Sequence, residues 1–98
     1  MYDSKNRGKL TETIKLTSKI FLGEEIDQTE LRLYPYIDYC LKNGGYMEPR
    51  KTSAEEKRII EKRKNEGHMF VRTDGTITVT RPFYDFIQDI LADAYVLF

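Results

Sequence analysis

The chain has 98 residues, of which 40% are hydrophobic, so it can form one small domain with a modest core and is too apolar for intrinsic disorder. Sixteen basic and sixteen acidic residues give a net charge of zero, and no apolar run approaches the roughly 18 residues that a membrane helix requires. The only cysteine, Cys40, excludes an intrachain disulfide and suits a reducing compartment. We therefore expect a cytoplasmic protein that has no membrane partner.

The charges alternate in blocks along the chain. Residues 50–64 carry seven basic and three acidic side chains, whereas residues 82–98 carry three acidic side chains and none that is basic. Residues 1–20 are also basic on balance, and residues 21–49 are acidic. This pattern has two interpretations: a dipolar surface that meets DNA on one side and a protein on the other, or blocks that neutralise one another within one fold.

The first predicted element follows a lead-in, residues 1–9, that we expect to be flexible. Residues 10–22 are predicted to form a helix that ends before Gly23, because four side chains recur at helical spacing. These are Leu10, Ile14, Thr17 and Phe21. Apolar residues also recur at the even positions of this segment, so a strand remains possible.

The second segment offers two possible helix starts. Asp27 and Glu30 have the spacing of a capping box, but a helix that begins there would carry Pro35 in its interior, where proline breaks or kinks a helix. We therefore expect the helix to begin near Pro35, because a proline in the first turn costs little, and to end at Asn43-Gly44-Gly45. The side chains that then face the core are those of Leu33, Ile37, Cys40 and Leu41.

A third, lysine-rich helix is predicted over residues 53–65. Its first serine and Glu56 have the spacing of a capping box, and a glycine follows the last turn. Its apolar anchors are few, only Ile59 and Ile60, and Arg63 falls between them on the helix wheel. We expect Arg63 to pack its aliphatic stem and to extend its guanidinium outward.

A β-hairpin is predicted from His68 to Thr80, with Asp74-Gly75 as a two-residue turn. That turn pairs Phe70 with Val79 and Arg72 with Ile77. The face directed at the core would then carry Phe70, Ile77 and Val79, and a four-residue loop would keep the same faces.

The last predicted helix runs from Pro82 to Phe98 and is strongly amphipathic. Its apolar face holds Phe83, Phe86, Ile87, Ile90, Leu91 and Ala94, and these residues complete the predicted core. An acidic row off that face holds Asp85, Asp89 and Asp93. The final turn is apolar on every side and must pack on its own domain or on another chain. We expect a homodimer whose interface is formed by Tyr95, Val96, Leu97 and Phe98.

The order helix, helix, helix, hairpin, helix resembles a winged helix-turn-helix domain. The resemblance covers residues 10–98 by element order, with no sequence motif of the family behind it. It implies that residues 53–65 are a recognition helix for the major groove and that residues 69–80 are a wing. The nucleic-acid contacts that it implies are Lys57, Arg58, Lys62, Lys64, Arg72 and Thr73. The connection at residues 44–52 is longer than this family's usual turn, and the final helix is acidic.

On the helix wheel the basic residues of the third helix form two edges. Arg58 and Lys62 share one edge, Lys57 and Lys64 share the other, and Glu61 lies between them. They could neutralise phosphates, or they could simply form a solvated helix with local ion pairs such as Glu61 with Lys64.

The sequence therefore predicts a small, mostly helical α+β domain with one hairpin and no enzymatic activity. We expect no cofactor and no metal, because His68 and Cys40 alone cannot supply a structural zinc site. The first functional hypothesis is regulatory binding of double-stranded DNA. The alternative is a protein–protein interaction module, such as a small inhibitor or adaptor, that uses its tyrosines and its acidic helix. Neutral net charge favours the alternative, and the element order favours DNA binding.

Overall fold

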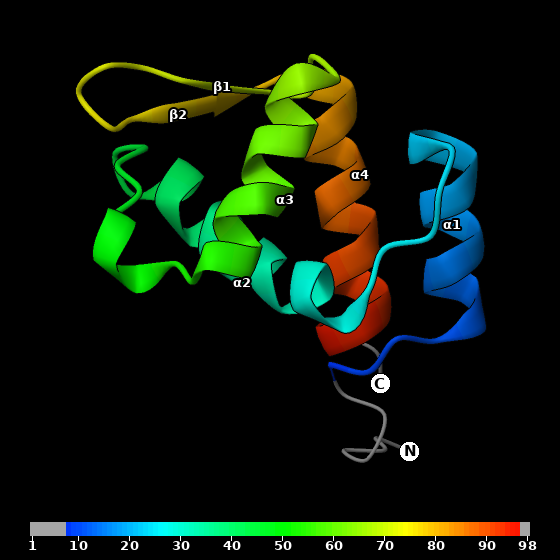
Figure 1. The fold of residues 1–98 in the computed structure, drawn as a ribbon. Helices are drawn as coiled ribbons and strands as arrows, with labels where there is room; N and C mark the ends of the chain where they lie inside the picture. The colour runs from blue at the N-terminus through cyan, green and yellow to red at the C-terminus, as the bar shows by residue number, and fades with distance from the viewer. Residues whose placement is uncertain (1–7, 97–98) are drawn as a thin grey trace.

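The predicted order of three helices, a hairpin and a fourth helix is confirmed (Figure 1). The structure is a computed structural model that describes residues 8–96, apart from the side chain of Val96. The elements are α1 (Glu12–Leu22), α2 (Gln28–Lys42), α3 (Ala54–Asn65), β1 (Met69–Val71), β2 (Ile77–Val79) and α4 (Arg81–Leu91), with a short 3-10 turn at Pro49–Lys51 and a π-helical turn at Ala92–Val96. The fold is a small, mostly helical α+β fold, as the sequence predicted.

Capping residues set the ends of α1 and α3. The Thr11 side chain accepts a hydrogen bond from the Ile14 backbone N–H at 3.2 Å, and Gly23 ends α1 in the left-handed conformation, so the helix prediction for this segment is confirmed. At α3, Ser53 and Glu56 form both hydrogen bonds of a capping box, at 3.1 and 2.7 Å.

Helix α2 begins earlier than predicted and continues through Pro35. Its cap is Asp27, whose carboxylate accepts a hydrogen bond from the Glu30 backbone N–H at 2.8 Å. The predicted start near Pro35 is wrong. An internal proline costs about 3 kcal/mol in an isolated helix, but the turns before it bury Leu31 and Tyr34, and that packing outweighs the cost. The predicted core residues of α2 are confirmed, with Leu41 only partly buried.

The predicted hairpin is confirmed, but its register is not. Strands β1 and β2 pair Met69 with Val79, Phe70 with Thr78 and Val71 with Ile77. The turn holds three residues, 73–75, because the Gly75 N–H donates to the Arg72 carbonyl at 3.0 Å and the Arg72 N–H donates to the Thr76 carbonyl at 2.8 Å. Gly75 has φ +91°, as in a type I turn followed by a glycine bulge.

This one-residue shift exchanges the two faces of β1. Met69 is 1% exposed and Phe70 is 51% exposed, so the prediction that Phe70 belongs to the core is wrong. Side chains alternate along a strand, and a slip of one residue therefore moves each of them to the other face.

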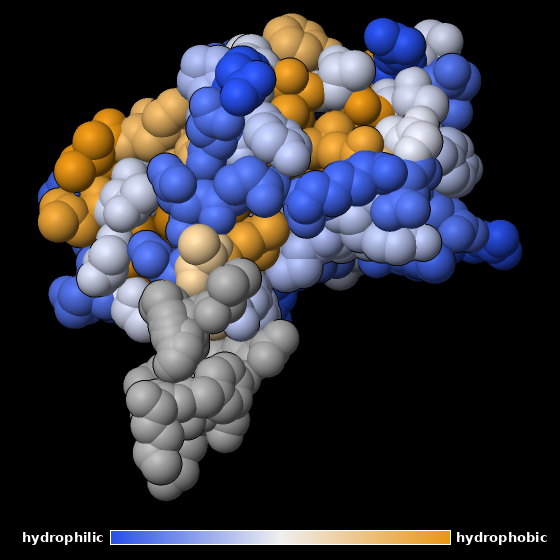
Figure 2. Space-filling view, turned by 180° about the vertical axis from the view of Figure 1, so that it is seen from behind, coloured by the Kyte–Doolittle hydropathy of each residue, from blue (hydrophilic) through white to orange (hydrophobic). Residues whose placement is uncertain are grey.

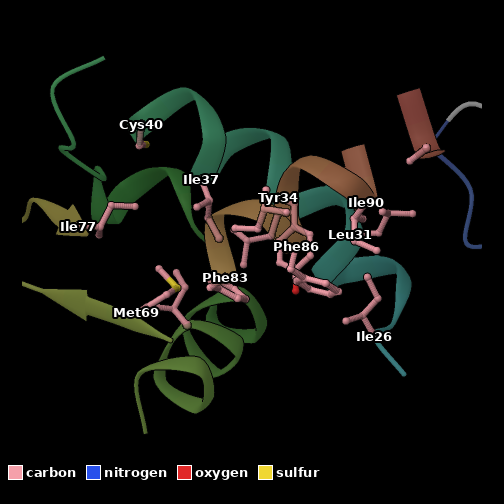
Figure 3. Packing of buried hydrophobic residues seen from close by; sticks show 14 of the residues in the cluster. Ile26, Leu31, Tyr34, Ile37, Cys40, Met69, Ile77, Phe83, Phe86 and Ile90 are labelled. Atoms are coloured by element: carbon pink, nitrogen blue, oxygen red, sulfur yellow. The ribbon is translucent and has the colours of Figure 1, made fainter. Parts of the chain in front are cut away.

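The core lies where α4 packs between α1 and α2, and the hairpin closes one end (Figures 1 and 3). Figure 3 shows Met69 beside Phe83 and Ile77 near Ile37. Apart from Phe70, the predicted core of the hairpin and α4 is confirmed. Ile77, Phe83, Phe86, Ile87, Ile90 and Ala94 are buried, and Val79 and Leu91 pack against them while partly exposed.

The hairpin is fixed to the body along both strands. Strand β1 packs on α3, and the Ile77 N–H donates to the Gly45 carbonyl at 2.7 Å. The Met47 N–H donates to the Gly75 carbonyl at 3.1 Å, and the Tyr46 ring lies so close to Gly75 that a Cβ there would be 2.6 Å from it. The position of the hairpin relative to α3 is therefore set by the fold.

Candidate nucleic-acid interface

The structure divides the predicted DNA-binding residues among three surfaces. Lys57 and Lys64 line a hollow of about 320 Å³ between α3, the hairpin and the loop of residues 46–52. Ile60 of α3 and Ile77 of β2 contribute buried apolar side chains to the lining. Val71 of β1 contributes an exposed one. We call this surface the α3–hairpin face. It is the place where a basic edge of α3 and the predicted wing meet.

The other edge of α3 faces away from the hairpin. Arg58 and Lys62 line a separate hollow of about 580 Å³ that is also lined by Asp27, Glu55 and Glu66. Lys62 forms an ion pair with Glu24 at 2.6 Å. The carboxylates around this edge make it a poor surface for phosphate. The division of α3 into two edges matches the helix wheel, and Glu61 lines both hollows.

Arg72 and Thr73 are exposed on the hairpin, but Arg72 does not line the α3–hairpin face. It lines a third hollow, of about 600 Å³, together with Arg81 and Tyr84. In the turn, the backbone N–H and the hydroxyl of Thr76 both donate to Asp74, which lowers the pKa of the Asp74 carboxyl. The tip is thus a well-ordered turn.

The cations of the predicted site differ in how far they are neutralised. Lys64 forms an ion pair with Glu61 at 3.3 Å, so the alternative of local pairs along the helix is correct for this residue. Within the described residues, Lys57, Arg58 and Arg72 have no carboxylate within 4.0 Å.

Two further cations, absent from the predicted set, border the α3–hairpin face. Arg50 and Lys51 are exposed on the 3-10 turn, in the loop whose Pro49 and Thr52 line the hollow. Both form ion pairs with Glu48, at 3.3 and 3.9 Å. The available signal was their place in the basic block of residues 50–64. Only the fold shows that this loop lies beside α3.

Arg63 is buried, and the prediction that its guanidinium extends outward is wrong. Only 2% of the residue is exposed. Its Nε and Nη2 atoms both donate to the Glu30 carboxylate at 2.7 Å, and Nη1 donates to Glu24 at 3.0 Å and to Glu66 at 2.7 Å. The Tyr34 hydroxyl donates to Glu30 at 2.6 Å. This Arg63 cluster joins α3 to α2 and fixes the back of the basic helix.

Burial and hydrogen bonding act in opposite directions in the Arg63 cluster. Burial disfavours the charged guanidinium, but hydrogen bonds to Glu30 and Glu66 outweigh it and raise the pKa of Arg63 further. Burial, with the neighbouring Glu30 carboxylate, raises the pKa of the Tyr34 hydroxyl well above its ordinary value. The cluster therefore stays charged at Arg63 and neutral at Tyr34 over the physiological range.

Glu24 gives the fold a predicted pH dependence. A hydrogen bond from Lys62, opposed by partial burial and assisted by Arg63, lowers the pKa of the Glu24 carboxyl. Its contribution to stability is therefore present above the pKa of an unfolded glutamate, about 4.3, and is lost as pH falls through the lower folded value. We expect the melting temperature of Glu24→Gln to fall less on acidification than that of the wild type. The melting temperature of Glu25→Gln, at an exposed neighbour, should fall as that of the wild type does. Identical acid melting profiles for wild type and Glu24→Gln would contradict this.

The predicted dimer interface is only partly within the described residues. Tyr95 is half-buried and packs against its own core, and a Cβ at Gly8 would lie 3.1 Å from the Tyr95 ring. The side chain of Val96, and all of Leu97 and Phe98, lie outside the described residues. A homodimer through this end of the chain stays a prediction.

Cys40 and His68, the two residues considered as metal ligands, are packed against the rest of the fold. Cys40 is buried, which raises the pKa of its thiol, and His68 stacks on Phe83 with 5.2 Å between the ring centroids. In residues 8–96 the structure has no group of three or more His, Cys, Asp or Glu side chains placed to hold a metal ion. Across the same residues, none of the helices has both the length and the apolar character needed to cross a membrane.

Comparisons with protein families, with characterised proteins and with solved structures found no match to this chain. The case for a function therefore rests on the geometry of the described residues.

Proposed function

We propose that this chain is a non-enzymatic regulatory protein that binds double-stranded DNA through the α3–hairpin face. The observation that carries the proposal is that Lys57 and Lys64 line the same hollow as Val71 and Gly75 of the hairpin. A basic helix edge and a hairpin on one rigid surface suit a groove and its flanking phosphates. The element order, which resembles a winged helix, supports the same assignment.

The charge around this face is positive although the chain is neutral. Arg50, Lys51, Lys57 and Lys64 border it, against the carboxylates of Glu48 and Glu61. Cations at such a surface neutralise phosphates and release condensed counterions, which supplies sequence-independent affinity. Asp85 and Asp89 of α4 line a groove beside α1 and do not line the α3–hairpin face.

The Arg63 cluster gives the proposed interface its rigidity. It ties α3 to α2 through Glu30, so that Lys57 and Lys64 project from a fixed helix. A preorganised cationic surface loses less entropy when it binds than a flexible one does. Arg63 thus acts by positioning α3 and does not contact the nucleic acid.

The proposal predicts unequal effects for the two edges of α3. Lys57→Ala and Lys64→Ala should each weaken binding to all duplexes alike and reduce the salt slope by about 0.9 for each phosphate that is no longer neutralised. Lys62→Ala is the matched control, because Lys62 lies on the other edge of α3, in the hollow that no hairpin residue lines. Glu61→Gln should tighten binding, since it removes a negative charge and frees Lys64. Fluorescence anisotropy with a labelled duplex of random sequence, measured over a range of salt, gives these values.

No binding to the duplex at low salt would reject the proposed function and favour the protein–protein interaction module. Equal reductions in affinity for Lys62→Ala and Lys57→Ala would show that the duplex does not bind preferentially at the α3–hairpin face.

A further inference from the structure

Helix α1 exposes two large apolar side chains on the face directed away from the core. Leu16 is 60% exposed and Ile20 is 78% exposed, one helical turn apart. Figure 2 shows apolar atoms gathered at the edge of the molecule that α1 forms. Single exposed apolar residues are common, but two in one row beside a groove indicate a contact surface.

A groove of about 250 Å³ runs beside this row, between α1 and α4. It is lined by Thr17, Ile20 and Phe21 of α1 and by Pro82, Asp85, Phe86 and Asp89 of α4. Its lining is apolar and aromatic, and carboxylates of α4 stand along one side. Asp85 forms an ion pair with Arg81 at 3.0 Å, whereas Asp89 has no cationic partner within 4.0 Å among the described residues.

The opposite flank of α1 carries the complementary charge. Lys15 is neutralised by Glu12 at 3.3 Å, but Lys19 is exposed and has no carboxylate within 4.0 Å in the described part of the chain. Lys19 lies between Thr17 and Ile20 in sequence, and both of these residues line the groove with Asp89. On the helix wheel, Lys19 falls on one side of the Leu16–Ile20 row, and the groove that Asp89 lines lies on the other side.

We propose that α1 and this groove form a homodimer interface, in which two copies are related by a two-fold axis parallel to α1. Such an axis brings the Leu16–Ile20 row of one copy against that of the other and carries the Lys19 flank of each copy to the Asp89 flank of the other. The dimer then contains two Lys19–Asp89 pairs, one on each side of the apolar row. Because the same surface is used on both copies, the assembly stops at two chains. An antiparallel arrangement would place the two aspartate flanks together and is disfavoured.

The interface is small, and this sets the conditions of the test. An 11-residue helix is about 16 Å long, so its exposed face and one groove cover less than the roughly 800 Å² per partner of a standard interface. We therefore expect a dimer that dissociates on dilution and that forms at about 10–500 µM, in the range of weak complexes. It does not depend on nucleic acid, and it differs from a dimer formed through Tyr95–Phe98.

Sedimentation velocity of the full chain, without DNA, tests the interface. Ile20→Ser should weaken the dimer about tenfold or more, whereas Phe70→Ser, which removes another exposed apolar side chain, from the hairpin, should not change it. Lys19→Glu and Asp89→Lys should each weaken the dimer, and the double variant should restore it, because the pair is then reversed. Circular dichroism melting shows that each variant is folded.

Four results would overturn this proposal. One is a monomer at every concentration, and another is a dimer that Ile20→Ser leaves unchanged. Failure of the Lys19→Glu, Asp89→Lys double variant to recover the dimer would reject the two-fold arrangement. Dissociation of the dimer in Leu97→Ser or Phe98→Ser, with no change in Ile20→Ser, would place the interface at the end of the chain.

Discussion

Arg63→Met is expected to destabilise the fold by about 3–5 kcal/mol, because it leaves the Glu30 carboxylate buried without its counter-charge. Glu30 would keep only the hydrogen bond from Tyr34, where it now also accepts two from the guanidinium. A loss of this size is a large part of the roughly 5–15 kcal/mol that holds a small domain folded. Urea unfolding followed by circular dichroism measures it.

The control for this prediction removes the buried part of the cluster. Glu30→Leu, Tyr34→Phe and Arg63→Met together replace every buried polar partner with an apolar group of similar size, and such replacements are often neutral or stabilising. We expect the triple variant to be more stable than Arg63→Met alone. If Arg63→Met costs less than about 1 kcal/mol, the value typical of exposed ion pairs, then the guanidinium is solvated and the cluster does not hold α3 to α2.

The second large effect is expected at Met69. Met69→Ala should cost about 2–5 kcal/mol, because the side chain is buried beside Phe83 and its removal leaves a cavity (Figure 3). Phe70→Ala removes more atoms but should cost far less, since half of that side chain is already in water. The comparison of their unfolding free energies reports the register of the hairpin directly.

The opposite order of the two effects would contradict the pairing of Met69 with Val79. It would mean that the turn holds two residues and that Phe70 faces the core. The amide exchange rates of the turn give an independent check, because the Gly75 N–H is hydrogen-bonded to Arg72 only in the three-residue turn.

The features that the sequence predicted correctly depend on neighbouring residues. The capping box of Ser53 and Glu56, the terminating Gly23 and the apolar face of α4 are all settled within one or two helical turns. The order of elements follows from these local signals, and the α+β class follows from the order.

The errors arose where distant parts of the chain decide between two local options. Asp27 and Pro35 gave two acceptable starts for α2, and the burial of Tyr34 against α4 residues selects the earlier one. Asp74-Gly75 is compatible with turns of two or three residues. The contacts of Gly75 with Tyr46 and Met47 are part of what holds the longer turn, and they are not visible in the hairpin sequence alone.

The candidate site, like the fold, was predictable from the sequence only where neighbouring residues decide it. The helix wheel separated the Lys57 edge of α3 from the Arg58 edge, but it could not tell which of them faces the hairpin. It also could not show that Arg63 pairs with Glu30, 33 positions away, or Lys62 with Glu24, 38 positions away. Such long-range ion pairs decide which cations remain free to bind a ligand.

The central claim, that the α3–hairpin face binds duplex DNA, is tested most directly by NMR. A titration of the nitrogen-15-labelled chain with a short duplex of mixed sequence should shift the amide resonances of Arg50, Lys57, Lys64 and Gly75, while that of Ile20 on α1 stays in place. The shifts should diminish as salt is added. No shifts at low salt, or shifts confined to α1 and α4, would contradict the claim.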